Sequence, residues 1–151
     1  TQTGPILVSV SLDGSRPLVS YNLTATVEAS NATAQAVCSD ADVISLNSLY
    51  SPPRIRPTNA FAGTCNAQSD ASEQAFTFTL QSASAVEVEL MSAPRDTTVY
   101  IRQTCGDANT ERGCAVAEPM LTTGVLPAGT YTLFVESTES VTPSFIVRTV
   151  P

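Results

Sequence analysis

Alternation of apolar and polar residues in short runs is the feature of this sequence that most restricts its fold. It recurs in FTFTL at 76–80, VEVEL at 86–90, TVYI at 98–101, YTLFV at 131–135 and FIVRTV at 145–150. A period of two places the apolar side chains of each run on one face and the polar side chains on the other. One buried and one solvated face is typical of antiparallel sheets. We therefore predict an all-β fold, a two-sheet antiparallel β-sandwich.

The segments between these runs favour turns over helices. They include DGSRP, QSASA, APRD, LPAG and STESVTP, which are rich in turn-forming residues. No stretch carries an apolar period of 3.6 beyond a turn or two, so no helix is predicted. Residues 30–74 are the least regular part of the chain. The prolines of SLYSPPRIRPTNAFAG at 48–63 favour extended edge structure or loop there.

Residues 1–30 repeat the pattern of the end of the chain. The matching runs are ILVSVSL at 6–12 with YTLFVES at 131–137, and YNLTATV at 21–27 with SFIVRTV at 144–150. We therefore predict an N-terminal β-hairpin extension at 1–30 and a sandwich domain at 31–151. Three origins of the hairpin stay open. It is the tail of a preceding domain, a strand pair that joins another subunit, or two extra strands of the same sandwich.

The charged residues exclude several classes of function. The formal net charge is −7, with 14 acidic residues, seven Arg, no Lys and no His. Binding to nucleic acid or to an anionic membrane surface needs a basic face, which this chain lacks. No apolar run approaches the about 18 residues of a membrane span. Without His and Lys there is no Ser-His-Asp system, no Cys-His system and no Schiff base, so we predict no enzyme and no cofactor.

The four cysteines, Cys38, Cys65, Cys105 and Cys114, indicate disulfides. With no His and no C-x-x-C spacing, a zinc site is disfavoured. Disulfides persist in oxidising compartments, so we expect an extracellular or cell-surface protein. Of the three possible connectivities, proximity along the chain favours 38 with 65 and 105 with 114.

Several acidic residues are candidates for a site. Glu87 and Glu89 share one face of a strand, where we expect them to be solvated, since glycosidase carboxylates come from opposite sides of a cleft. Asp96 is expected to fix the turn into its strand. Four further residues would either collect Ca²⁺ or, as we expect, form turns: Asp40, Asp42, Asp70 and Asp107. We predict no metal site.

Three aromatic residues are candidates for a sugar-stacking platform. Tyr50, Phe61 and Tyr100 supply rings, but carbohydrate modules often stack sugars on Trp, and this chain has none. We expect the three rings to serve ordinary packing instead.

Five segments between residues 38 and 137 occur in an order that resembles a known family. They are CSDADVISL, AGTC, EQAFTFTLQSASAVEVEL, RDTTVYIRQTC and LPAGTYTLFVES. This order resembles the pre-peptidase C-terminal type of β-sandwich, in the cysteine-bearing form that recurs in tandem in secreted bacterial proteins. The likeness covers about 38–150. It implies a jelly-roll-like fold without catalysis, appended to proteases or strung together on surfaces, with substrate or matrix binding and calcium in some members.

Two functional hypotheses from different classes follow. The first is a non-catalytic extracellular structural subunit of a surface assembly or filament, in which copies join by β-strand addition. The donated strand would bind its partner through Ile6, Val8, Val10 and Leu12, so a homo-oligomer or polymer is expected. The second is a carbohydrate- or matrix-binding module cut from a larger secreted protein, with a surface polysaccharide as a possible partner.

Overall fold

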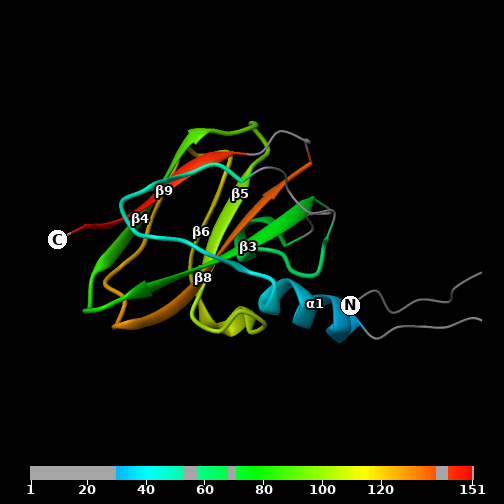
Figure 1. Cartoon of the computed structure of the whole chain (residues 1–151). Coiled ribbons are helices and arrows are strands. Elements are labelled where there is room, and N and C mark those ends of the chain that lie inside the picture. Colours follow the sequence, from blue (N-terminus) through cyan, green and yellow to red (C-terminus); the bar gives the residue numbers. More distant parts are fainter. Residues whose placement is uncertain (1–29, 53–57, 68–70, 139–142, 151) are drawn as a thin grey trace, which may run out of the picture.

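The protein is a β-sandwich with one helix packed against it (Figure 1). A computed structural model describes residues 30–52, 58–67, 71–138 and 143–150. The predicted β-hairpin, and with it the division into an extension at 1–30 and a sandwich at 31–151, involves residues 1–29, which lie outside the described residues.

The larger sheet has five strands in the order β1-β3-β8-β5-β6. Their bounds are β1 Asp42–Val43, β3 Ser72–Leu80, β8 Gly129–Ser137, β5 Thr98–Arg102 and β6 Glu111–Val116. Every neighbouring pair is antiparallel except β1 with β3, which is parallel. The long β3–β8 ladder runs from Ser72 opposite Ser137 to Leu80 opposite Gly129 and forms the centre of this sheet.

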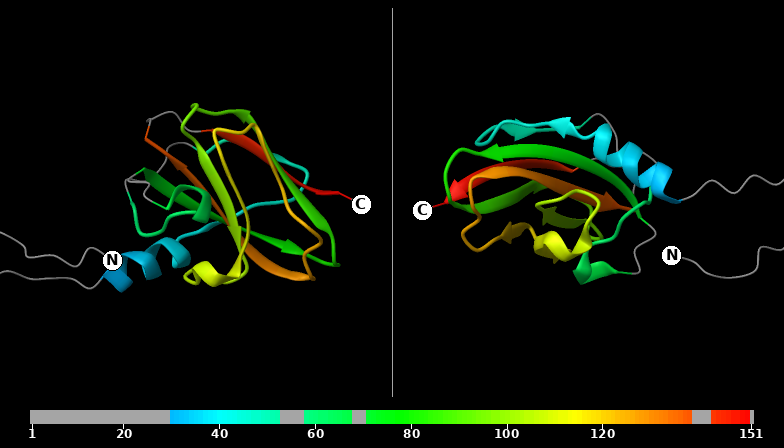
Figure 2. Two further views of the ribbon diagram at one scale, coloured as in Figure 1. Left: turned by 180° about the vertical axis from the view of Figure 1, so that it is seen from behind. Right: turned by 90° about the horizontal axis from the view of Figure 1, so that it is seen from below.

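The smaller sheet has four strands in the order β2-β9-β4-β7, all antiparallel. Their bounds are β2 Leu49–Tyr50, β9 Ser144–Val150, β4 Ala85–Ser92 and β7 Met120–Thr122. Figure 2 shows the two sheets from behind and from below. The two-sheet β-sandwich predicted from the alternation is therefore confirmed.

The core lies between the two sheets and is built from the residues that alternation placed inward. Phe76, Phe78 and Leu80 of β3 are at most 2% exposed, and Val86 and Val88 of β4 are fully buried. They pack with further buried side chains from the other strands of both sheets, among them Val99, Ile101, Leu121, Tyr131, Leu133, Phe145 and Val147. Burial of each such aliphatic or aromatic side chain contributes about 1.5–3 kcal/mol, so this interior dominates the stability.

Part of the outer face of the five-stranded sheet is covered, which corrects the expectation of one wet face per sheet; Thr79 and Thr130, at the other end of the β3–β8 ladder, remain exposed. Ala75, Tyr100 and Phe134 point outward from this sheet and are at most 3% exposed. They pack with Val37 and Phe61 into a second, smaller apolar cluster. The alternation rule failed here because a helix and an irregular segment, neither of which has a strand pattern, cover this face.

The covering helix is α1, Ser30–Ser39, and no helix was predicted. Its sequence, SNATAQAVCS, has three Ala, which favour helix, but no apolar stripe of period 3.6. Among the helix side chains that the structure describes, only Val37 is buried. Figures 1 and 2 show α1 alongside the first half of β3. A short helix is marginal by itself, so tertiary contacts must hold this one in place.

The disulfides join Cys38 to Cys105 and Cys65 to Cys114, with Cα–Cα distances of 5.9 and 5.8 Å. The predicted pairing of 38 with 65 and 105 with 114 is wrong. Cys114 lies opposite Tyr100 in the β5–β6 ladder, whereas Cys105 lies beyond the end of β5. The β5–β6 ladder therefore holds Cys114 beside Tyr100, away from the turn that carries Cys105, and each of the two pairs with a cysteine from the segment before β3 instead.

Both bridges tie the segment that precedes β3 to the β5–β6 end of the five-stranded sheet. In chain order, the first cysteine joins the third and the second joins the fourth, so the two covalent loops overlap. The first bridge anchors the end of α1, and the second anchors η1, a 3-10 turn at Thr64–Asn66.

Among the described residues, no helix is both long and apolar enough to cross a membrane.

Candidate functional site

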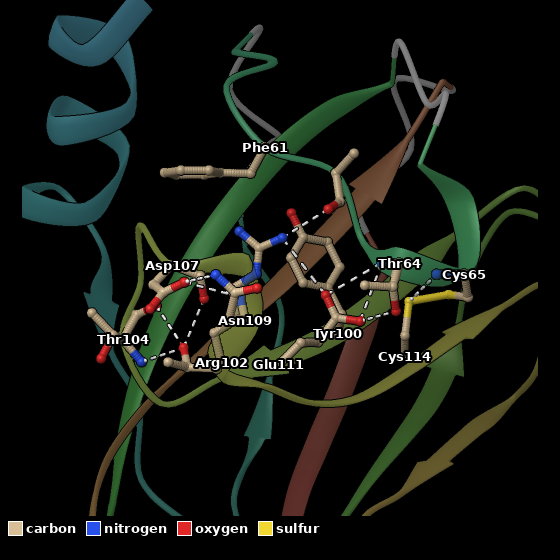
Figure 3. A network of polar contacts seen from close by, with 12 residues as sticks. Phe61, Thr64, Cys65, Tyr100, Arg102, Thr104, Asp107, Asn109, Glu111 and Cys114 are labelled. Atoms are coloured by element: carbon tan, nitrogen blue, oxygen red, sulfur yellow. Dashed lines mark hydrogen bonds and ion pairs between the residues drawn. A yellow bond between two sulfur atoms is a disulfide. The ribbon is translucent and has the colours of Figure 1, made fainter. Parts of the chain in front are cut away.

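A network of polar contacts joins residues 58–66, which we call the strap, to the five-stranded sheet; Figure 3 shows part of it. The strap crosses the outer face of the five-stranded sheet. It begins where Thr58 bridges Glu73, whose backbone N–H donates to the Thr58 carbonyl at 2.8 Å. It ends at η1, where Cys65 is bonded to Cys114 of β6.

Glu73 is the residue on which the strap is anchored. Its side chain points to the outer face of β3 and is fully buried. The carboxyl oxygens accept backbone N–H bonds from Ala60 at 2.5 Å and from Phe61 at 3.2 and 3.3 Å. The Tyr100 hydroxyl also donates to this carboxyl group, at 3.5 Å. The Glu73 carboxyl thus satisfies two backbone groups of the strap that would otherwise be unpaired under it.

Glu73 has a second carboxylic acid directly beside it. Glu136 of β8 is its partner in the β3–β8 ladder, and Glu136 is also fully buried. Directly opposite residues have Cβ atoms about 4.5–5.5 Å apart, so the two acids repel when both are ionised. Burial raises the pKa of Glu73 to about 7. The Ala60 N–H opposes this rise, the nearby Glu136 charge adds to it, and the bonds from Phe61 and Tyr100 oppose it.

Arg102 brings a positive charge to the same face. It is 2% exposed, donates to the Ala62 carbonyl at 2.7 Å, and lies 3.6 Å from Glu111 of β6. Its guanidinium carbon also lies 4.9, 5.5 and 5.4 Å from the ring centroids of three aromatic residues, which are Tyr100, Phe61 and Phe134 respectively. Buried guanidinium groups need this combination of hydrogen bonds, counter-charge and ring faces.

The end of the strap is held by Glu111. The Thr64 backbone N–H donates to both of its carboxylate oxygens, at 3.1 and 3.3 Å, and the Thr64 hydroxyl donates to the first of them. Gly63, just before, lies so close to the sheet that an added Cβ would stand 2.7 Å from Cys114 Sγ and 2.8 Å from Tyr100 Cδ1. Only glycine fits this approach without displacement of the disulfide or the ring.

Tyr100 fills the centre of the cluster and cannot act as a base. It is fully buried and stacks on Phe134 with ring centroids 4.6 Å apart. Burial raises its pKa far above the ordinary value of a tyrosine, and the neighbouring charges of Glu136 and Glu73 add to the rise, while Arg102 opposes it. The hydroxyl therefore stays protonated and serves as a hydrogen-bond donor.

The site residues considered in the sequence do not gather into one site. Glu87 and Glu89 lie on the outer face of β4, where both pair with Arg148 of β9. Their side chains are 24% and 38% exposed. They therefore form a partly solvated ion-pair cluster, as expected in outline. The strand predicted to bind a partner, with Ile6, Val8, Val10 and Leu12, lies outside the described residues.

Of the aspartates expected to form turns, Asp107 does so at the start of a 3-10 turn, whereas the expectation is wrong for Asp42, which lies in β1. Asp42 accepts from Gln74 Nε2 at 2.9 Å, and Asp107 accepts from the Asn109 backbone and side chain at 2.9 and 3.0 Å. Asp40 follows α1, and Asp70 lies outside the described residues. Within the described ranges, no three acidic or cysteine side chains come together in a way that would hold a metal ion.

Asp96 fixes the turn into β5, as predicted. Its carboxylate accepts from the Thr138 backbone N–H at 2.8 Å, from the Thr138 hydroxyl, and from the Ser137 hydroxyl at 3.1 Å. These bonds join the start of β5 to the end of β8.

The aromatic platform is not formed. Tyr50 packs in the inter-sheet core, 5.2 Å from Phe76 and 5.6 Å from Phe145 between ring centroids. Phe61 and Tyr100 lie on the opposite side of the five-stranded sheet, against Phe134. Ordinary packing, the expected role, is confirmed for all three rings.

The charged residues of the buried cluster, unlike Phe61 and Tyr100, were not singled out in the sequence. Glu73 and Glu136 lie within EQAFTFTL and YTLFVES, two segments that otherwise read as strands rich in large apolar residues. A carboxylic acid in such a strand was the available signal, but only the cover provided by the strap decides that it is buried. Chemically, the cluster can hold or release a proton, but its acids have no exposed surface to offer a substrate.

No family model and no curated protein matches the sequence. Among solved structures, the chain is similar to the pre-peptidase C-terminal domain of collagenase from Bacillus anthracis. The match has a TM-score of 0.51 and 17% sequence identity, and it covers 72% of this chain and 95% of that chain. At this identity the likeness concerns the fold. The chain thus has the fold of a pre-peptidase C-terminal domain, in agreement with the family that its sequence resembles.

Proposed function

We propose that this chain is a non-catalytic module of an exported protein, which works by contact with other macromolecules. The observation that carries this proposal is the burial of Glu73, Glu136 and Tyr100, which are each 0% exposed. Catalytic acids and bases must reach a substrate, and these are covered by the strap. The similar domain is itself an appended part of a collagenase by its description.

The two disulfides support an extracellular or cell-surface location, because such bonds persist in oxidising compartments. They also account for how a chain with so irregular a segment before β3 stays compact. Each bridge fixes one piece of that segment to the sheet. Disulfides of this kind are common in small exported domains and rare in cytosolic proteins.

We propose that copies join by β-strand addition, with residues 5–12 as the donated strand. Of the four edge strands described, β1 and β2 have two residues each, β7 has three and β6 has six. β6 is therefore the edge best matched to an eight-residue donor. Its free side can pair with a strand, whereas the interior between the sheets is already filled by the chain's own residues.

The donor has the form that strand addition requires. Full burial of Ile6, Val8, Val10 and Leu12 against a partner would contribute about 6–12 kcal/mol, and pairing with an edge strand realises only part of this. The cost of ordering the strand and of association opposes it. Because donor and acceptor surfaces differ, the contact is heterologous and would extend into a polymer when it does not close into a ring.

A carbohydrate- or matrix-binding module is the second candidate, and one observation favours it. Leu49, Ile146, Glu89 and Met120 form one row across the outer face of the four-stranded sheet. Leu49 is 60% exposed and Met120 is 47% exposed, which leaves apolar surface for a partner. The likeness to a domain of a collagenase also supports a role in holding a matrix substrate.

Measurement of mass against concentration tests the assembly proposal. The intact chain should form oligomers or polymers in light scattering, and the chain without residues 1–14 should be folded and monomeric. A double change of Val8 and Val10 to Lys should abolish assembly, because it charges the binding face. The matched control, Ser9 and Ser11 to Lys, charges the opposite face of the same strand and should leave assembly intact.

Three results would contradict assembly by strand addition. An intact chain that is monomeric at high concentration excludes it. Unfolding on deletion of residues 1–14 assigns the strand to its own sandwich. Equal loss of assembly in both double variants would mean that the apolar face of the strand is not the surface that binds the partner. If the intact chain is monomeric, its co-sedimentation with insoluble polysaccharide or collagen would favour the binding module. The double variant Leu49→Lys with Met120→Lys should then lose this binding.

A further inference from the structure

The strap is held by a carboxyl group whose charge and position are coupled. Glu73 accepts both the Ala60 and the Phe61 N–H bonds, and it does so at full burial. A carboxyl oxygen accepts such bonds whether the acid is neutral or ionised. The closed strap therefore does not need the charge, while burial opposes the charge.

The neighbouring acid, Glu136, further disfavours the ionisation of Glu73. Glu136 stands directly opposite Glu73 on β8, and it is equally buried. Two buried carboxylates at cross-strand distance disfavour the doubly ionised state. When the strap lifts, water reaches Glu73, and both the burial penalty and part of the repulsion disappear.

Among the described residues, the charged and titratable groups that lie near Glu73 do not cancel this effect. Arg102 of β5 is a buried cation on this face. It is already bound to the Ala62 carbonyl and lies 3.6 Å from Glu111 of β6. Tyr100 of β5 stays a neutral donor. On the remaining side, Asp40 after α1 lines a cavity of about 90 Å³ together with Glu73.

The anchor points determine how the strap can move. Cys65 is bonded to Cys114, so the end of the strap cannot leave the sheet while the bridge is intact. The stretch from Thr58 to Thr64 is held by hydrogen bonds, of which the two on Glu73 lie at its centre. Lifting this stretch would uncover the Tyr100 and Phe134 rings, on which Phe61 packs.

We propose that residues 58–64 form a pH-responsive flap, closed over the five-stranded sheet while Glu73 carries a proton and released as Glu73 ionises. The disulfide at Cys65 is its hinge, and the apolar cluster of Tyr100 and Phe134 is the surface that it covers. This inference is independent of whether copies assemble through residues 5–12.

The direction of the effect follows from proton linkage. The closed flap holds the Glu73 pKa at about 7, whereas an exposed glutamate has the ordinary value of 4.5. The closed form therefore binds the proton more tightly. Its advantage is complete below pH 4.5 and is lost as pH rises through about 7. Opening becomes more frequent by at most roughly 300-fold over this range.

Hydrogen exchange at the Ala60 and Phe61 amides tests the flap in the full chain with both disulfides intact. Protection factors, corrected for the intrinsic exchange rate, should fall on the order of a hundredfold between pH 5 and pH 8. Amides in the β3–β8 ladder should show a much smaller change. Equal protection of Ala60 and Phe61 at the two pH values would overturn the proposal.

Three variants separate Glu73 from its neighbours. Glu73→Gln keeps the acceptor but cannot ionise, so its flap protection should not depend on pH. Glu111→Gln changes the other carboxylate that holds the strap, at Thr64, and should keep the pH dependence. Glu136→Gln removes the neighbouring charge and should move the transition to lower pH. Flap protection that still depends on pH in Glu73→Gln, or that no longer depends on pH in Glu111→Gln, would contradict the flap. If Glu73→Gln does not fold, Glu136→Gln provides the test, because it keeps Glu73.

Discussion

Cys114 stands directly opposite Tyr100 in the β5–β6 ladder, on the outer face of the five-stranded sheet. From this position its sulfur reaches Cys65 in the strap, and Gly63 passes between the bridge and the tyrosine ring. The register of one hairpin thus decides which cysteines can pair, and the covalent framework follows from β-sheet geometry rather than from proximity along the chain.

The first prediction concerns the connectivity of the two disulfides and their contribution to stability. Non-reducing peptide mapping should link the peptide of Cys38 to that of Cys105 and the peptide of Cys65 to that of Cys114. Loss of either bridge by a double Cys→Ala change should lower the free energy of unfolding by about 4 kcal/mol on the chain-entropy account, as measured with urea. A 105–114 linked peptide would show that the β5–β6 register is different.

The second prediction concerns Gly63. Gly63→Ala should lower the free energy of unfolding by about 1–3 kcal/mol, because its Cβ would lie 2.7 Å from Cys114 Sγ and 2.8 Å from Tyr100 Cδ1. Gly106→Ala is the matched control, since nothing lies within 4 Å of a Cβ at that position. Urea unfolding of both variants gives the comparison, and equal effects would mean that the strap does not lie so close to the sheet.

The third prediction concerns Arg102. Arg102→Ala should cost about 3–5 kcal/mol of unfolding free energy, because it removes the donor to Ala62 and leaves Glu111 without its buried counter-charge. Arg102→Lys should recover only part of this, since an ammonium cannot match the planar contacts with the rings. Arg112→Ala is the control, because Arg112 is exposed and bonds only to Gln103 among the contacts described. A small effect of Arg102→Ala would place the guanidinium in solvent.

The fourth prediction is an acid-dependent contribution from Asp96. Burial raises the pKa of Asp96, but the hydrogen bonds from Thr138 and Ser137 outweigh it, so the pKa lies below the ordinary value of 3.8. A lowered pKa contributes stability that is present above the unfolded value and is lost as pH falls through the folded value. Asp96→Asn should therefore destabilise by about 1–2 kcal/mol at pH 7 and by less at pH 3.

The control for Asp96→Asn is Glu118→Gln, which removes one exposed negative charge elsewhere on the surface. Urea unfolding at the two pH values should show no comparable dependence for it. A cost of Asp96→Asn that is the same at pH 3 as at pH 7 would mean that the carboxylate charge is not what joins β5 to β8.

Much of the sandwich was predictable because its interior obeys a local rule. Phe76 and Phe78 alternate with threonines, and Val86 and Val88 alternate with glutamates, so each strand shows its buried face in the sequence. The strand order was not predictable in this way, and nor was the parallel pairing of β1 with β3. Alternation within a strand carries no information about its neighbour.

The buried cluster was not predictable because its cause is non-local. Glu73 and Tyr100 occupy positions that face away from the core, where polar residues normally meet water. Their burial comes from α1 and from the strap, and neither has a periodic pattern. The cysteine pairing depends on the same cover, since Cys38 and Cys65 lie in those two segments. A residue-by-residue interpretation cannot detect a layer that is held by long-range bonds.

The crossed order of the bridges also determines what a protease can do to this protein. With Cys38 joined to Cys105 and Cys65 joined to Cys114, every peptide bond between residues 38 and 114 lies inside at least one covalent loop. A single cleavage anywhere in that interval leaves both products attached to each other. Bridges between sequence neighbours would have left residues 66–104 as a stretch in which one cut separates the halves. Fragmentation of this region therefore takes two cuts or a reductant, which would suit the exported module that we propose.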